Sequence, residues 1–164
     1  MRKGTTGARR VLIQMLSDKL LRKKKEIDKV FHALDSTLVL VEGKRDRAAL
    51  RDAGVTAPVV LCGGRKAERV AEEAQSLGLP ATLLFDWDDE GERKTGEYSE
   101  LMRADIRLRK KMKRLLGLRT VEELGFRLSE LEKKVNENNG KNLHRHGKVP
   151  GEGELRDRRH RREA

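Results

Sequence analysis

Short apolar runs alternate with segments of helical spacing through the middle of the chain. Three runs have the β-branched, apolar character of buried parallel strands: TLVLVE at 37–42, APVVLC at 57–62 and ATLLFD at 81–86. Two segments between them have helical spacing, at 45–54 and 65–78. Gly54 and Gly78 end these segments, where helix C-caps usually need glycine. The pattern predicts an α/β fold with a parallel sheet covered by helices.

Helical spacing also marks the segments on both sides of this middle region. Residues 8–34 carry apolar residues on one helical face, namely Leu16, Leu20, Ile27, Phe31 and Leu34. Residues 104–117 form a basic helical pattern that Gly117 stops. A last pattern at 120–138 opens with Thr120 and Glu123 spaced as a capping box. We therefore expect one helix before the sheet and two after it.

Two segments show little periodicity. Residues 92–104 are mostly polar, and LMRAD at 101–105 is a poor candidate for a fourth strand. Apolar periodicity is absent from Asn139 onward, so we expect residues 139–164 to be disordered until they meet a partner.

Residues with chemical potential follow each expected strand. Glu42 ends the first run, Cys62-Gly63-Gly64 the second and Asp86 the third. Ligands of parallel α/β sheets bind at the carboxyl ends of the strands. We therefore expect Glu42 and Asp86, which are far apart in sequence, to meet at one edge of the sheet.

The charge is unevenly distributed along the chain. The net charge is +11, 40% of the residues are charged and 3% are aromatic. Residues 1–30 hold ten Lys/Arg and three Asp/Glu, whereas residues 31–100 hold nine and fourteen. The later segments are basic again, with eleven and six at 101–138 and eight and four at 139–164. Basic arms suit nucleic-acid phosphates, because counterion release favours binding, although a solvated basic surface has the same composition.

A single cysteine, Cys62, excludes an intrachain disulfide and a zinc site of several cysteines. It fits a reducing compartment, and its place at the end of an apolar strand favours burial over reactivity. There is no apolar run of about 18 residues, and the N-terminal sequence MRKGTTGARR lacks the apolar core of a signal peptide. We expect a soluble, cytoplasmic protein.

Two short motifs, VEGKRD and FDWDDEG, resemble those of the Toprim domain. This domain is shared by type IA and type II topoisomerases, bacterial-type primases, OLD-family nucleases, RecR-type recombination proteins and small ribosomal-RNA maturases. The family has a glutamate after its first strand, here Glu42, and an Asp-x-Asp after its third, here Asp86 and Asp88. The length and the sequence ADIRLRKKMKRLLGLRTVEEL are most similar to the small stand-alone Toprim proteins of archaea.

The resemblance divides the chain into four parts. They are a basic N-terminal helix at 1–35, a Toprim-like domain at 36–115, a C-terminal helix at 116–138 and a basic tail at 139–164. The predicted fold class is therefore α/β, with a Toprim-like parallel sheet flanked by helices, an added N-terminal helix, C-terminal helices and a basic tail.

The residue types support a metal site independently of the resemblance. Mg²⁺ prefers hard oxygen ligands and keeps several waters, so a few carboxylates and a substrate phosphate make a typical site, which Mn²⁺ also suits. Asp86 and Asp88 point the same way if the strand continues through them, and we expect them to hold the ion. Glu42 would help to ligate it or transfer a proton. The resemblance, and not the spacing, implies that catalytic proton-transfer role for Glu42.

A calcium loop is an alternative interpretation of the same acidic stretch. DWDDEGERKTGE at 86–97 has Asp at positions one and three, Gly at six and Glu at twelve of an EF-hand loop. Against this, position five is Glu90, position eight is Arg93, and the preceding residues have a strand pattern. A solvated acidic turn without metal is a further alternative.

Neighbouring cations and glycines are candidates for phosphate contacts. Lys44 and Arg45 follow Glu42, and Arg65 follows Gly63 and Gly64 in a loop of the kind that faces phosphates. Ordinary surface cations explain Lys44 and Arg45 equally well. There is no GxxxxGK[ST] sequence, so a Walker-type nucleotide site is unsupported.

The other polar residues near the motifs have structural alternatives. Asp89 and Glu90 would bind the metal through water or remain solvated, and Asp46 is either the N-cap of the next helix or a site residue. We expect Trp87 to pack on the opposite face of the strand from the two aspartates. His144 and His146 could bind a metal, although a tail without periodicity is a poor setting for a metal site.

Absent features narrow the activities that the resemblance allows. Tyr98 is the only tyrosine and lies close to the acidic motif, which argues against a topoisomerase, and 164 residues with one cysteine leave no room for a primase core with its zinc module. We expect a Mg²⁺-binding protein that acts on nucleic-acid phosphodiesters, as a small nuclease or RNA-processing factor. The alternative is a non-catalytic subunit that binds nucleic acid. RNA and DNA are equally compatible with the sequence.

Overall fold

A computed structural model describes residues 5–143. Four parallel strands pair in the order β2-β1-β3-β4, namely β1 (Leu38–Val41), β2 (Val59–Leu61), β3 (Ala81–Leu83) and β4 (Ala104–Asp105). The helices are α1 (Thr5–Asp35), α2 (Lys44–Asp52), α3 (Ala67–Ser76), α4 (Asp89–Leu101), α5 (Arg107–Leu116) and α6 (Leu124–Leu143), with a 3₁₀ turn η1 (Val121–Glu123) before α6. The predicted α/β class with a parallel sheet is confirmed.

Strand β1 lies in the interior of the sheet, and its four residues are all buried. Because side chains alternate along a strand, Val39 and Val41 face one layer of the core, and Leu38 and Leu40 face the other. Helices α1, α2, α5 and α6 cover the first layer, and α3 and α4 cover the second. Burial on both faces explains why the strand sequences are continuously apolar.

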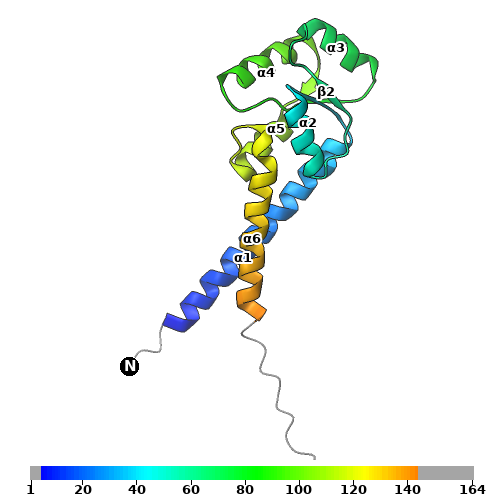
Figure 1. Ribbon diagram of the computed structural model, residues 1–164. Coiled ribbons are helices and arrows are strands. Elements are labelled where there is room, and N and C mark those ends of the chain that lie inside the picture. Colours follow the sequence, from blue (N-terminus) through cyan, green and yellow to red (C-terminus); the bar gives the residue numbers. More distant parts are fainter. Residues whose placement is uncertain (1–4, 144–164) are drawn as a thin grey trace, which may run out of the picture.

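The first and last helices form an arm that leaves the sheet, as Figure 1 shows. Ile27 on α1 and the α6 residues Leu131 and Val135 belong to the same buried cluster, so the two helices pack side by side near the sheet. Glu26 on α1 pairs with Lys111 on α5 at 2.7 Å. We call this helix pair the arm, and the sheet with its other helices the head.

The helix ends follow the sequence closely. Gly54, Gly78 and Gly117 have positive φ angles of 89°, 67° and 65°, which glycine adopts without strain, and they follow α2, α3 and α5 as predicted. The expected capping box at Thr120 does not form, because the Thr120 side chain makes no capping bond and Glu123 instead accepts a bond from the Arg119 amide.

Several boundaries differ from the sequence prediction. A fourth strand does exist within 101–105, where Ala104 and Asp105 pair with β3, so the expected start of a helix at 104 was wrong. The polar segment after Asp88 is helix α4. Helix α6 continues to Leu143, so residues 139–143 are not the start of a disordered tail. The expected disorder of 144–164, including His144 and His146, lies outside the described residues.

Within residues 5–143, none of the helices combines the length and apolar character that a membrane span requires.

Candidate functional site

The carboxyl ends of β1 and β3 bring the predicted acidic residues to one edge of the sheet. Leu40 on β1 is opposite Leu83 on β3, and the Leu84 amide donates to the Leu40 carbonyl at 2.9 Å. Glu42 and Asp86 follow these positions, and Glu42 contributes to raising the pKa of Asp86. The convergence expected from the sequence is therefore present.

Asp86 is a half-buried carboxylate in a negative environment. Burial raises its pKa, and the charges of Asp88 and Glu42 raise it further. The Val121 amide, which donates to Asp86 Oδ1 at 2.8 Å, opposes this shift. A cation near Asp86 would therefore stabilise its ionised carboxylate.

Asp88 caps helix α4. Its Oδ1 accepts a bond from the Gly91 amide at 2.7 Å, as an N-cap carboxylate does. Gly91 is required by a close approach, because a Cβ at this position would lie 1.8 Å from the Asp86 carbonyl oxygen. The capping turn therefore holds both aspartates of the Asp-x-Asp sequence in a defined conformation.

Glu42 forms an ion pair with a lysine of helix α4. Lys94 Nζ on α4 lies 2.6 Å from Glu42 Oε1 and 3.2 Å from Glu90 Oε1. The Lys94 side chain is only 17% exposed. Burial lowers its pKa, but the hydrogen bonds to Glu42 and Glu90 outweigh this effect and raise it overall. Lys94 is thus a charged member of the site that the sequence did not reveal.

A buried arginine supports the backbone of the Asp-x-Asp turn. The Arg109 guanidinium donates from Nε to the Phe85 carbonyl at 2.9 Å and from an Nη to the Asp86 carbonyl at 2.5 Å. It also pairs with Glu92 at 2.9 Å and lies over the Trp87 ring. Trp87 is buried, as predicted. In the sequence, Arg109 is one of several cations in a basic helical segment. Nothing in its local sequence predicts that it is buried.

The segment that follows α5, at residues 119–121, contacts the Asp-x-Asp turn. The Trp87 amide donates to the Arg119 carbonyl at 2.9 Å, and the Val121 amide binds Asp86. Trp87, Asp88, Asp89, Arg119, Thr120 and Glu123 line a pocket of about 550 Å³ beside the turn. Sequence reasoning missed this segment, because its contacts join residues more than thirty positions apart.

Asp46 adds a fourth carboxylate to this edge. Burial raises its pKa, the bond from the Gly43 amide at 2.9 Å lowers it, and the charges of Asp86, Glu122 and Glu42 raise it again. Asp46 is not the N-cap of α2, as one alternative had it, because Gly43 occupies that position.

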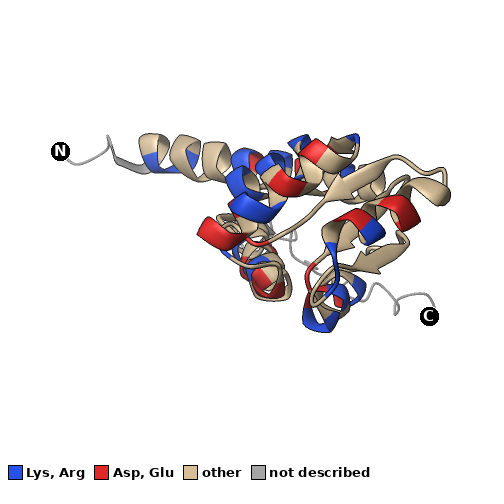
Figure 2. Cartoon of the chain, turned by 90° about the horizontal axis from the view of Figure 1, so that it is seen from above, with Lys and Arg blue, Asp and Glu red and all other residues tan. Residues whose placement is uncertain are grey.

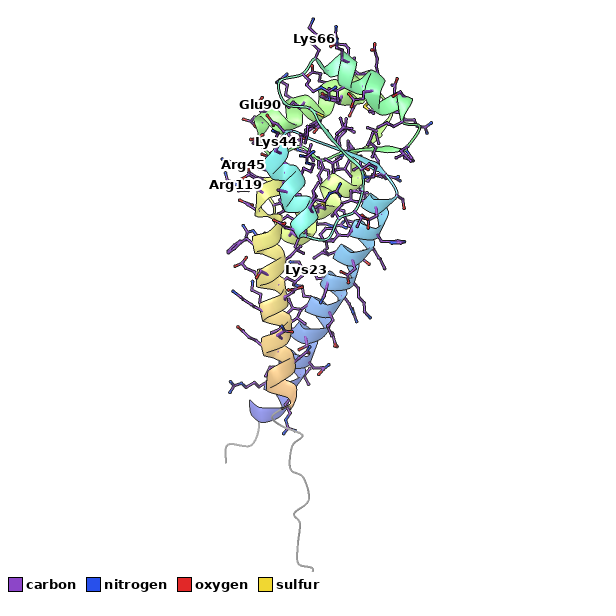
Figure 3. All side chains as sticks on the ribbon, turned by 45° about the vertical axis from the view of Figure 1, so that its right-hand side comes forward. Lys23, Lys44, Arg45, Lys66, Glu90 and Arg119 are labelled. Carbon is purple, nitrogen blue, oxygen red and sulfur yellow. The ribbon has the colours of Figure 1, made fainter. Side chains whose placement is uncertain are left out.

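The predicted phosphate-binding residues lie at the same end of the sheet but differ in their contacts. Lys44 and Arg45 open helix α2, and Figure 3 shows them with Glu90 and Arg119 on one side of the head. Gly63 is needed for close approach, since a Cβ there would lie 2.7 Å from the Glu42 carbonyl oxygen.

The other candidates at this end have different roles. Gly64 has a φ of 68° and Arg65 pairs with Glu73 of α3. Asp89 is exposed on the first turn of α4, and Glu90 pairs with Arg93 as well as Lys94. Cys62 is a buried thiol whose burial raises its pKa to about 11, so it is unreactive at neutral pH.

The donor set suits a hard divalent cation, but it is not arranged as a complete cage. Among residues 5–143, no three His, Cys, Asp or Glu side chains are close enough together to hold a metal ion. One oxygen each of Glu42, Asp86 and Asp88 is engaged, by Lys94, Val121 and Gly91 respectively. The second oxygens of Asp86 and Asp88 accept no hydrogen bond from the described residues, so each aspartate keeps one carboxylate oxygen of the type that Mg²⁺ prefers.

The calcium-loop alternative does not fit the conformation of this segment. From Asp89 onward the residues of the proposed loop belong to helix α4, and a strand rather than a helix precedes them. An EF-hand loop needs its ligands wrapped around the ion between two helices, which this backbone does not provide.

Comparison with known proteins identifies a structural neighbour without a named function. No protein-family model and no curated protein matches the chain. A solved structure of a protein from Aquifex aeolicus is similar with a TM-score of 0.53 and 27% sequence identity. The similarity covers 61% of this chain and 95% of that one. Nearly the whole neighbour therefore aligns with this chain, and the rest of this chain has no counterpart in it.

Proposed function

We propose that this protein is a Toprim-type, Mg²⁺-dependent phosphodiesterase that acts on nucleic acid, as a small nuclease or an RNA-processing factor. The observation that carries the proposal is the meeting of Glu42 and Asp86 at the ends of two adjacent parallel strands, with Asp88 on the next turn. These are the acidic positions that the Toprim resemblance requires, on the expected sheet.

Each acidic residue has a distinct role in this proposal. Asp86 and Asp88 would hold Mg²⁺, which when bound polarises the scissile phosphate and stabilises charge on the leaving oxygen. Glu42 would help to ligate the ion, or hold or release a proton at the attacking or leaving oxygen, and Lys94 pairs with its carboxylate in the metal-free protein. Arg109 and Val121 fix the turn on which the two aspartates lie.

Basic residues on two parts of the molecule would supply affinity for the phosphate backbone. Lys44, Arg45 and Arg119 lie on one side of the head together with Glu90, and Lys23 lies on the arm (Figure 3). The turns of α1 farthest from the head are mostly tan and blue in Figure 2. Phosphate contacts of this kind bind nucleic acid irrespective of its sequence and weaken as salt rises.

The state of the single cysteine favours a cytoplasmic location. Its single cysteine is a buried thiol, so nothing in the fold depends on oxidising conditions.

A non-catalytic subunit that binds nucleic acid is the second candidate. The observation that favours it is the ion pair between Glu42 and Lys94, which engages the carboxylate that would otherwise transfer protons. In that case Mg²⁺ would bridge Asp86 and Asp88 to phosphate without turnover.

Cleavage assays distinguish the two functions. We would incubate wild type, Glu42→Gln and Asp86→Asn with end-labelled structured RNA, single-stranded DNA and duplex DNA, in Mg²⁺, Mn²⁺, Ca²⁺ or chelator. Cleavage in Mg²⁺ or Mn²⁺ that both variants lose supports the phosphodiesterase and identifies its substrate class. Salt-sensitive binding without cleavage of any substrate supports the binding subunit.

A further inference from the structure

Lys94 is placed to compete with a metal ion for the Glu42 carboxylate. Its ammonium group lies 2.6 Å from Glu42 Oε1, and its side chain is only 17% exposed, so water screens the pair less than at an open surface. A divalent cation that recruits Glu42 as a ligand must displace this ammonium group or share the carboxylate with it.

The same ammonium group already bridges a second carboxylate. Lys94 also contacts Glu90 Oε1 at 3.2 Å, one helical turn earlier on α4. The Glu90 side chain is 63% exposed, and Glu90 is not one of the carboxylates expected to bind the metal directly. If Lys94 releases Glu42, it keeps a carboxylate partner, which lowers the cost of the exchange.

We propose that Lys94 is a positioning residue that acts as the resident counter-cation of Glu42, so that a metal ion that takes Glu42 as a ligand requires Lys94 to release Glu42 while it keeps its contact with Glu90. The inference rests on the proposed metal-dependent function and adds a device that sets its metal affinity. In the metal-free protein, Lys94 holds the Glu42 carboxylate at the end of β1. In the metal-bound protein, the same ammonium group remains near the site, where its positive charge would attract an anionic substrate.

The test measures binding of Mn²⁺ alone by titration calorimetry, without nucleic acid. We expect Lys94→Met to tighten Mn²⁺ binding about tenfold, because it removes a like charge from the site and releases the Glu42 carboxylate. Lys94→Arg keeps the charge and should stay within about twofold of wild type. Lys113→Met is the control, since it removes an exposed cation of α5 that forms no ion pair within the described residues.

A double-mutant comparison shows whether Lys94 acts through Glu42. In a Glu42→Gln background, Lys94→Met should change the Mn²⁺ affinity less than about threefold, because the carboxylate for which the two cations compete is gone. Lys94→Gln, checked by circular dichroism, serves as a second charge-removing variant if Lys94→Met does not fold.

Each outcome has a defined meaning. Equal Mn²⁺ affinities of wild type and the charge-removing variants, or an equal gain in the Glu42→Gln background, would overturn the inference and leave the metal-dependent function intact. No Mn²⁺ binding by any variant would overturn both. Metal affinities that follow the expected order, in a protein that cleaves no substrate, would support the inference and reject the nuclease.

Discussion

Arg109 and Trp87 contact each other through two different interactions. The Arg109 guanidinium lies 5.5 Å from the centre of the Trp87 ring, while the Trp87 indole donates from Nε1 to the Arg109 carbonyl at 3.2 Å. The pair joins helix α5 to the Asp-x-Asp turn, and the guanidinium binds backbone carbonyl oxygens of that turn rather than its carboxylates. A buried positive charge thus supports an acidic site without occupying its ligand atoms.

Removing the Arg109 charge should destabilise the protein strongly. We expect Arg109→Met to lower the free energy of unfolding by about 2–4 kcal/mol, because the carbonyls of Phe85 and Asp86 lose a charged donor. Urea denaturation would measure it. Arg107→Met is the control, since that side chain is 89% exposed, and its loss should cost less than about 0.5 kcal/mol. Equal losses from both variants would show that Arg109 has no special role.

Two glycines of helix α4 should respond in opposite ways to alanine. A Cβ at Gly91 would lie 1.8 Å from the Asp86 carbonyl oxygen, whereas a Cβ at Gly96 meets nothing within 4 Å. We expect Gly91→Ala to cost more than about 2 kcal/mol and to weaken Mn²⁺ binding, because the turn must shift. Gly96→Ala should stabilise the helix by about 0.5–1 kcal/mol. A fully stable Gly91→Ala protein would contradict the described turn.

Neutralising Asp86 should stabilise the metal-free protein. The folded pKa of Asp86 is raised, so its ionised form opposes folding at neutral pH, and this disadvantage disappears as the pH falls below the unfolded value. We expect Asp86→Asn to melt at a higher temperature than wild type at pH 7, with a smaller difference at pH 3. Millimolar Mg²⁺ should raise the melting temperature of wild type but not of this variant.

The neighbouring exposed acid provides the control for that experiment. Asp89→Asn removes a charge from the first turn of α4, where a carboxylate favours the helix, so its melting temperature should not rise. A rise in both variants would mean that general charge reduction, and not the environment of Asp86, is responsible.

The ion pair between the arm and the head should make stability depend on pH. Hydrogen bonds from Lys111 and Lys29 lower the pKa of Glu26 to about 2, from an ordinary value of 4.5. A lowered carboxyl pKa stabilises the fold above the unfolded value, and this contribution is lost as pH falls from 4.5 to about 2. Glu26→Gln should therefore melt slightly lower than wild type at pH 7, because solvent screens this pair, and the gap should close in that acid range.

Salt and a second acid on the same helix check this interpretation. Sodium chloride at high concentration should narrow the gap at pH 7, because the Glu26 pair is partly exposed. Asp28→Asn, at an exposed position on α1, should melt as wild type does throughout. A gap that persists unchanged at pH 2 would contradict the ion-pair explanation.

Local patterns predicted the parts of this molecule that local interactions determine. The runs around β1 and β3 are buried on both faces, so their apolar sequence is a direct consequence of their position. Because parallel strands end at a common edge, the same pattern brought Glu42 and Asp86 together. The Mg²⁺ assignment and the Toprim resemblance stay predictions.

Contacts between distant segments could not be predicted in this way. Strand β4 has only two residues, too few for an alternating pattern, and pairing with β3 defines it. Helix α4 has few apolar residues and is fixed at its start by the Asp88 cap. The partners of Lys94 and Arg109 lie fifty-two and twenty-four positions away, so neither cation differs in sequence from a surface residue.

The arm has a consequence for the order in which the molecule forms. Its helices lie side by side although the whole sheet separates them in sequence, so their contact closes a very long loop. We expect the sheet to assemble first and α6 to dock on α1 late. Before that step, Leu20 and Ile27 on α1 lack the residues that cover them in the folded protein. The arm should accordingly exchange its amide hydrogens sooner than β1, which lies in the interior of the sheet.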